Sequence, residues 1–307
     1  MSGIDPRDYA LKLSLATQEA TDVKGFVDPV QVMKYGANIA RKVVGSATAC
    51  IVTLQSSELF AANLGDSGFL IVRPSKDNKS VQLIFKSEEQ QHSFNFPYQL
   101  GNSSSDRPED ADLYKLAVED GDLVILGTDG LFDNIDEKYI CRLVAAAIAG
   151  TEGGAQNLKI APLARFIAAE AFKVSQDPNA RTPFEIASRR RFTGGKPDDI
   201  TVLISRVRSN ANQTEDSSLS STTASKTVKS TTQKTSAPET GKTSSSTTTH
   251  KMITPSEADI IALRQLDASP IFDSEAEEEK VAEEELQPWF LQRVLGLRPW
   301  TFSSARL

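Results

Sequence analysis

Aspartate residues stand at the ends of three segments that the sequence predicts to be β-strands, in the stretches ANLGDSGFLIV, DLVILGTDGLFD and GGKPDDITVLI. The four acids concerned are Asp66, Asp129, Asp133 and Asp198. Taken singly, each has a structural explanation, because aspartate is a common residue of turns and of helix N-caps. Taken together, they would form a cluster of carboxylates if the three strand ends converge in the fold.

A carboxylate cluster of this kind predicts a bound metal ion. Gly65 and Gly130 stand beside two of the acids and would let the backbone approach closely. Two carboxylates about 4 Å apart repel by roughly 4 kcal/mol at an intermediate dielectric constant, so the cluster favours a cation. Ligands that are all oxygen select hard ions such as Mg2+ or Mn2+. Such an ion lowers the pKa of a bound water molecule, which indicates metal-assisted hydrolysis of a phosphate ester.

Composition narrows the classes of protein that the sequence can encode. The chain has 307 residues and a formal net charge of -7, which argues against a nucleic-acid binder. Two cysteines, Cys50 and Cys141, and two histidines, His92 and His250, are too few for a zinc site of the usual kind and favour a reducing, intracellular compartment. No apolar run reaches the roughly 20 residues of a membrane span. The opening MSGIDPRDYALKLS lacks the pattern of a secretory signal or a transit peptide.

Two other enzyme classes remain as weaker alternatives. A serine hydrolase would have to use His92, but no G-x-S-x-G motif accompanies that histidine. A glycosidase would use two of the carboxylates, but nothing beyond the acids themselves supports that chemistry.

The chain divides by composition into three parts. Residues 1–208 carry dense apolar periodicity, and residues 209–251 form a Ser/Thr/Lys-rich tract without aromatic residues, which we expect to be a disordered linker. Residues 252–307 form an acidic tail with short helices, one of which is predicted to begin with Thr254 as N-cap. The segment PWFLQRVLGLRPW could dock on a protein partner or on the domain, although a frayed tail is commoner. We expect the residues after Arg208 to add little to the stability of the domain.

The first part predicts an α+β fold. Asp28 and Pro29 are typical of a helix start, so DPVQVMKYGANIARKVV should be a helix. Six β-rich runs follow with short turns between them, and such spacing favours antiparallel hairpins over crossover units. The runs are TACIVTL, ELFAANLG, FLIVRP, VQLIFKS, ADLYKLAV and DLVILGTD. Two helical blocks, DEKYICRLVAAAIAG and AQNLKIAPLARFIAAEAFKVSQD, and a last strand, DITVLISRVR, complete a layered α+β architecture.

Several motifs in this part resemble those of one enzyme family. ANLGDSGFLIVR, TDGLFDNI and GGKPDDITVLI resemble the later motifs of the metal-dependent, type 2C protein serine/threonine phosphatases. SEEQQHSFNFPYQL and DPNARTPFEIA narrow the resemblance to the subgroup of the T-cell activation protein phosphatase homologue, whose members are often mitochondrial or plastid proteins. The match covers roughly residues 3–208 and keeps the motif order. It implies an α-β-β-α sandwich, with two antiparallel sheets between helical layers and metals in a cleft at one edge.

The resemblance also assigns roles to individual residues. Asp129 resembles the ligand of the bridging metals in the D-G-x-x-D motif, and Asp198 resembles the other late ligand, followed by Asp199 where many members have asparagine. Asp66 and Asp133 resemble ligands of a weaker third metal site. The implied cofactor is Mg2+ or Mn2+, and the implied substrate is a phosphoprotein. The implied reaction is attack of a metal-bound hydroxide on the phosphorus of phosphoserine or phosphothreonine.

One part of the family pattern is missing from the sequence. The family has an early D-G-x-G-G block, an acid upstream of it and an arginine near its start that contacts phosphate, and none of these is present. We therefore expect the domain to be incomplete at its N-terminal side, with weaker metal binding than in the family. The alternative is a non-catalytic pseudophosphatase that acts as a partner-binding module. The subgroup allows a mitochondrial location, but the compartment stays open.

Overall fold

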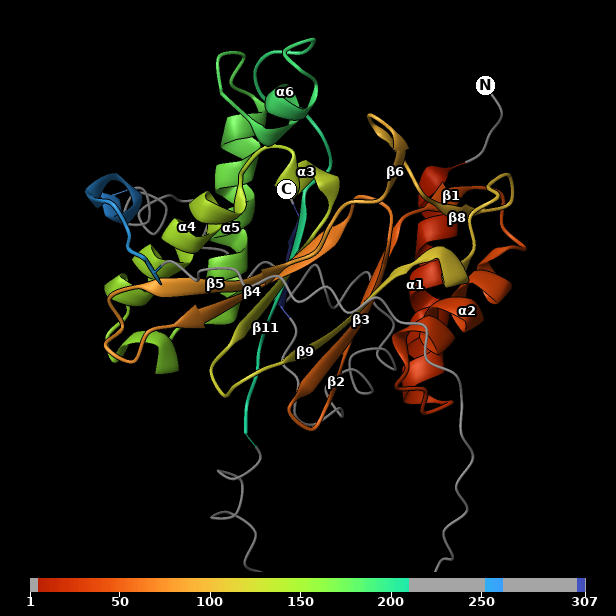
Figure 1. The fold of residues 1–307 in the computed structure, drawn as a ribbon, viewed down its shortest axis with the longest axis horizontal. Coiled ribbons are helices and arrows are strands. Elements are labelled where there is room, and N and C mark those ends of the chain that lie inside the picture. Colours follow the sequence, from red (N-terminus) through yellow and green to blue (C-terminus); the bar gives the residue numbers. More distant parts are fainter. Residues whose placement is uncertain (1–4, 210–251, 262–302, 307) are drawn as a thin grey trace, which may run out of the picture. The chain divides into compact units, whose positions relative to one another are not determined.

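The computed structural model describes residues 5–209, 252–261 and 303–306 of the chain (Figure 1). Almost all of the predicted linker and the segment PWFLQRVLGLRPW lie outside the described residues. The division into three parts therefore stays a prediction. Within the described part of the chain, no helix is long and apolar enough to cross a membrane.

Six strands form the larger sheet, in the order β12-β5-β4-β10-β11-β13, and every neighbouring pair is antiparallel. The central strand β10 thus lies between two strands that come from distant parts of the sequence. The strands are β4 (Gly68–Pro74), β5 (Val81–Lys86), β10 (Leu123–Gly127), β11 (Thr201–Arg206), β12 (Met252–Ile253) and β13 (Ser303–Arg306).

A smaller antiparallel sheet has the order β2-β3-β9, and two pairs of short strands flank it. Its strands are β2 (Ala49–Gln55), β3 (Glu58–Leu64) and β9 (Asp112–Ala117). The short pairs are β1 (Ser46–Ala47) with β8 (Leu100–Gly101), and β6 (Gln91–Ser93) with β7 (Phe96–Pro97). All six β-rich runs predicted from the sequence are strands in the structure.

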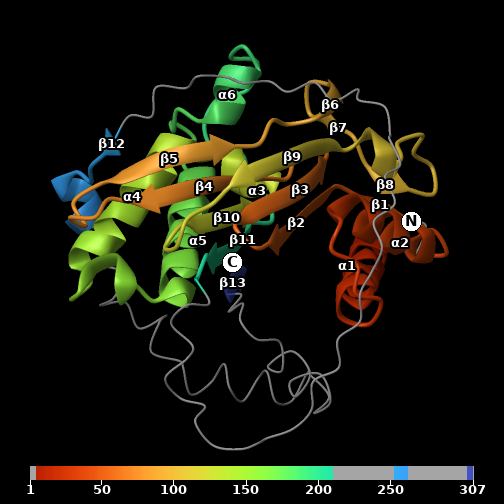
Figure 2. The ribbon, with the colours of Figure 1, turned by 60° about the horizontal axis from the view of Figure 1, so that its bottom comes forward.

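Helices cover the outer face of each sheet (Figures 1 and 2). Helix α2 packs on β2 and β3 of the smaller sheet, and α1 packs on α2. Helices α4 and α5 pack on the larger sheet. The long helices are α1 (Pro6–Asp22), α2 (Pro29–Ala40), α4 (Glu137–Gly150) and α5 (Ile160–Ser175). The short ones are α3 (Asp129–Phe132), α6 (Pro183–Ala187) and the 3-10 turns η1 (Pro108–Asp110) and η2 (Gly154–Gln156). The predicted α-β-β-α sandwich is confirmed.

Strand β4 shows why two sheets can stack. Its residues alternate between the two faces, as the period of a strand requires. Phe69 and Ile71 pack in the core between the sheets, and Leu70 and Val72 pack in the core beneath α4 and α5. Because both faces are covered, the strand reads as the continuous apolar run FLIV, which is typical of a doubly buried strand.

Helices α1 and α2 begin with the same local pattern, an aspartate N-cap followed by a proline. The Asp28 carboxylate accepts a hydrogen bond from the Val30 N–H and caps α2, as predicted. Asp5 caps α1 in the same way through the Arg7 N–H, and a proline follows it. Helix α1 was not predicted, although Asp-Pro marks its start as clearly as it marks α2.

A buried ion pair joins three strands of the larger sheet. The Asp122 carboxylate, which is fully buried, accepts hydrogen bonds from Arg73 Nε at 2.7 Å and Arg73 Nη2 at 2.8 Å. The main-chain oxygen of Asp122 accepts a hydrogen bond from the Val207 N–H at 2.8 Å. These contacts tie the end of β4 to the start of β10 and to the segment after β11.

We expect Asp122→Asn to lower the free energy of unfolding by about 3 kcal/mol, because it leaves Arg73 without its buried counter-charge. Urea denaturation measures the difference. Glu58→Gln is the control, since Glu58 pairs with Lys115 at 3.1 Å on the exposed surface and its loss should change stability by less than about 1 kcal/mol. Equal, small losses in both variants would contradict the prediction.

A segment near the C-terminus returns to the larger sheet. Strand β12 pairs with the edge of β5, and a helical turn begins at residue 257. Ser256 caps this turn rather than Thr254, because the Ser256 Oγ and the Asp259 carboxylate exchange hydrogen bonds with each other's N–H groups. The buried Asp259 carboxylate lies 3.5 Å from Arg142 Nε on α4. The expectation that residues after Arg208 add little to the domain is therefore revised for residues 252–261.

Asp259→Ala should loosen this segment, because it removes the carboxylate that accepts a hydrogen bond from the Ser256 N–H and pairs with Arg142. We expect faster amide hydrogen exchange at Val81 and Gln82 of β5 and in β12, with little change in the rest of β5. Glu257→Gln, two residues before Asp259 and exposed, should leave these exchange rates unchanged. Unaltered protection in the Asp259→Ala protein would show that the segment is not held by this residue.

Candidate functional site

The register of β10 brings the predicted acids to one end of the larger sheet. Gly127, the last residue of β10, is paired with Gly68 at the start of β4 and with Val202 near the start of β11. Since the three strands are antiparallel, the turn before β4, the segment before β11 and the chain after β10 meet at the same sheet end. The strand ends thus converge, as the metal-site hypothesis required.

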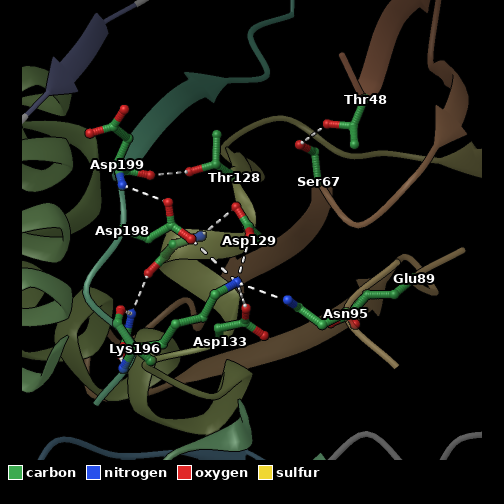
Figure 3. Close-up of polar contacts among 12 residues, drawn as sticks. Thr48, Ser67, Glu89, Asn95, Thr128, Asp129, Asp133, Lys196, Asp198 and Asp199 are labelled. Carbon is green, nitrogen blue, oxygen red and sulfur yellow. Dashed lines mark hydrogen bonds and ion pairs between the residues drawn. The ribbon is translucent and has the colours of Figure 1, made fainter. Parts of the chain in front are cut away.

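Three of the four acids surround a single cation, the ammonium group of Lys196 (Figure 3). The Lys196 Nζ atom lies 2.6 Å from Asp133 Oδ2, 2.8 Å from Asp129 Oδ2 and 3.3 Å from Asp198 Oδ2. Burial alone would lower the pKa of Lys196, but the hydrogen bonds to Asp129 and Asp133 outweigh it and raise the pKa above its ordinary value. The lysine is therefore charged and acts as the counter-ion of the cluster.

The charges of Asp129, Asp133 and Lys196 also act on Asp66. Among the hydrogen bonds of the described residues, none joins Asp66 to Lys196. Its side chain is buried, and burial together with the charge of Asp129 raises its pKa to about 6. The pKa of Asp133 also rises to about 6, mainly because of burial, although Lys196 acts in the opposite direction. Both shifts arise chiefly because burial disfavours the charged form of a carboxyl group.

The two predicted glycines permit close approach at this sheet end. A Cβ atom on Gly130 would lie 2.5 Å from the main-chain oxygen of Asp199, so a larger residue would push α3 away from the segment before β11. Gly65 has a φ of +108°, and a Cβ atom there would lie 2.6 Å from the main-chain oxygen of Tyr98. Glycine is required at both positions if Asp129, Asp198 and Asp66 are to stay together.

Asp199 contributes through its main chain. Its carboxylate points away from Lys196, whereas its carbonyl oxygen accepts a hydrogen bond from Thr128 Oγ1 at 3.1 Å (Figure 3). The Thr201 N–H donates to the same hydroxyl at 3.1 Å. Thr128 thereby fixes the segment that carries Asp198 against the start of α3.

Asn134 was missed by the sequence analysis although it braces the whole site. Its side chain is buried, and Nδ2 donates to the carbonyl oxygens of Gly130 at 2.8 Å and Lys196 at 2.9 Å. Its Oδ1 atom accepts from the Lys196 N–H at 2.9 Å. The amide thus holds the main chain of Lys196 beside α3. An asparagine next to the second acid of D-G-x-x-D was a signal, but sequence alone gave no reason to expect it to be buried.

The segment between β5 and β7 supplies two further polar groups that the analysis missed. Asn95 Oδ1 lies 3.4 Å from Lys196 Nζ. Desolvation by the surrounding protein raises the pKa of Glu89; the charge of Lys86 acts against this shift and the charge of Asp129 adds to it. The stretch SEEQQHSFNFPYQL, which contains Glu89 and Asn95, served only for the family resemblance. Glu89 adds one more acid near Asp129.

The donor set fits a hard divalent cation in its chemistry. The groups that converge are carboxylate oxygens from separate elements, and the charge of Lys196 does not balance them all. In the present conformation, however, no three His, Cys, Asp or Glu side chains among the described residues stand at the spacing of a metal site. The convergence point is held by an ammonium group instead.

Comparison with known proteins gives a consistent set of relatives, although no family model matches the sequence. The chain is 40% identical over 211 residues to "Probable protein phosphatase 2C 55" of Arabidopsis thaliana, covering 67% of this chain and 42% of the relative. It is 37% identical over 224 residues to "Protein phosphatase PTC7 homolog" of Danio rerio, covering 67% of this chain and 72% of the relative.

The fold has a counterpart among solved structures. The X-ray structure of the photosystem II phosphatase PBCP aligns with a TM-score of 0.56 and 26% identity, covering 67% of this chain and 84% of that one. The chain spans less than half of the length of the Arabidopsis relative.

The raised pKa of Asp66 predicts a dependence of stability on pH in the metal-free protein. The folded protein keeps a proton that the unfolded chain releases above the ordinary value of 3.8, so this contribution to stability is present at low pH and lost as pH rises through about 6. Asp66→Asn removes the ionisable group and with it the loss of stability at high pH. We expect it to raise the free energy of unfolding at pH 7.5 by about 1–3 kcal/mol and to have little effect at pH 4.

Urea denaturation in the presence of EDTA measures this difference at both pH values. Glu58→Gln, an exposed acid outside the site, serves as the control for the loss of one negative charge. An effect of Asp66→Asn that is equal at pH 4 and pH 7.5 would rule out the buried carboxylate as its cause.

Proposed function

The chain belongs to the type 2C family of protein phosphatases, and on that premise we propose that it is a metal-dependent enzyme that hydrolyses phosphoserine and phosphothreonine in proteins. The resemblance drawn from its motifs is confirmed at the level of the family. The single observation that carries the proposal further is the convergence of Asp129, Asp133 and Asp198 on one cationic group.

In the proposed enzyme, Asp129 and Asp198 would hold Mg2+ or Mn2+, and Asp66 and Asp133 would support the weaker third metal site. When bound, the cation activates a water molecule and withdraws charge from the phosphate. The chain's own residues provide a fixed frame for that chemistry. Asn134 and Thr128 hold the main chain on both sides of Asp198, so that only side chains have to reorganise when a cation arrives.

The pseudophosphatase alternative has one specific observation in its favour. The position at which the carboxylates converge already contains a positive charge, the ammonium group of Lys196. A protein that keeps this arrangement at all metal concentrations would have a phosphatase fold without turnover. Binding of a protein partner by the C-terminal acidic tail also stays a prediction from the sequence.

Hydrolysis of a phosphothreonine peptide by the purified chain separates the two proposals. We expect turnover with Mn2+, none with EDTA, and a loss of about 100-fold or more in kcat/KM for Asp129→Asn and for Asp198→Asn, because each change removes a charged metal ligand. Asp77→Asn, in the turn between β4 and β5, is the matched control and should keep full activity.

Two results would count against the enzyme. Turnover that continues in EDTA would exclude a metal-dependent reaction, and turnover that survives both substitutions would exclude these ligands. A folded chain without any turnover across a range of Mn2+ concentrations would favour the pseudophosphatase.

A further inference from the structure

We propose that Lys196 is a built-in competitor for the divalent cation, so that metal binding requires its ammonium group to leave the carboxylate cluster. The inference rests on the proposed function for the identity of the cation, but it concerns binding rather than turnover. It assigns to Lys196 the role of setting the metal affinity of the site.

The competition follows from shared ligands. The Asp129, Asp133 and Asp198 oxygens that contact Lys196 Nζ belong to the carboxylates proposed to bind the metal. Mg2+ binds oxygen at about 2.1 Å and needs these oxygens drawn closer together than an ammonium group does. A divalent cation at the convergence point would also lie against the positive charge of Lys196. The two cations therefore exclude each other.

The ammonium group can leave without moving the backbone. Asn134 holds the Lys196 N–H and carbonyl oxygen, so the anchor of the side chain stays in place. The flexible four-carbon stem allows the charged end to swing away from the acids. Two groups next to the present position could receive it. The Phe184 ring centroid lies 5.0 Å from Nζ, and Asn95 Oδ1 lies 3.4 Å from it.

The arrangement predicts opposite effects of Lys196 on the metal-free and metal-bound protein. Without metal, the lysine relieves the repulsion among the carboxylates and stabilises the fold. With metal, the same contacts have to be broken, so the lysine lowers the affinity. A merely structural lysine would give the first effect without the second.

Titration calorimetry with Mn2+ on the full chain tests the second effect. We expect Lys196→Met to bind Mn2+ at least about 10-fold more tightly than the wild type and to have a lower melting temperature in EDTA. Lys115→Met is the matched control, because Lys115 pairs with Glu58 at 3.1 Å on the exposed surface, away from the acids of the site, and should leave the Mn2+ affinity unchanged. An unchanged or weaker affinity in the Lys196→Met protein would overturn the proposal.

A second measurement uses the wild type and does not depend on how the variant folds. An amine-reactive reagent followed by mass spectrometry reports the exposure of Lys196, whose side chain is 16% exposed in the structure. We expect its labelling rate to rise several-fold when Mg2+ is added, whereas that of Lys115, which is already exposed, should not change. Constant labelling of Lys196 at saturating Mg2+ would overturn the proposal.

The outcomes separate this inference from the proposed function. A chain that binds Mn2+ and releases Lys196 but never hydrolyses the phosphopeptide would keep the inference and remove the enzyme. A chain that hydrolyses the peptide, while Lys196 labelling and the Mn2+ affinity of Lys196→Met stay unchanged, would keep the enzyme and remove the inference.

Discussion

Repulsion among carboxylates at one end of the larger sheet is the constraint around which the rest of the site is arranged. Asp129, Asp133 and Asp198 come from two segments far apart in the sequence, and the register of β10 against β4 and β11 forces their strand ends together. Such a cluster is stable only with a cation inside it. The position of Lys196 is the consequence, because its ammonium group supplies that charge from within the chain.

Rigidity at this site comes from neutral residues rather than from charged ones. Gly130 allows α3 to approach the main chain of Asp199, and Asn134 joins α3 to Lys196 through three hydrogen bonds. These contacts involve backbone atoms and not the carboxylates. If Lys196 gives way to a metal ion as proposed, the exchange needs no change in this main-chain geometry.

Sequence patterns predicted the strands and the four acids, but not the groups that complete the site. Alternating and continuous apolar runs identify β2 to β5, β9 and β10 because burial on one or both faces leaves a direct signature. Helix α1 was missed only because its Asp-Pro start went unread. Lys196 is different, since a lysine in a loop is usually solvated and its inward direction depends on contacts between residues more than sixty positions apart. The burial of Asn134 was unpredictable for the same reason.

Residues 252–261 return to the larger sheet, so the chain between them and β11 is attached at both of its ends. With β12 paired to β5 and Asp259 beside Arg142, the two ends of residues 209–251 are both fixed to one body. The docked segment is therefore always present at a high local concentration, whatever the dilution of the protein.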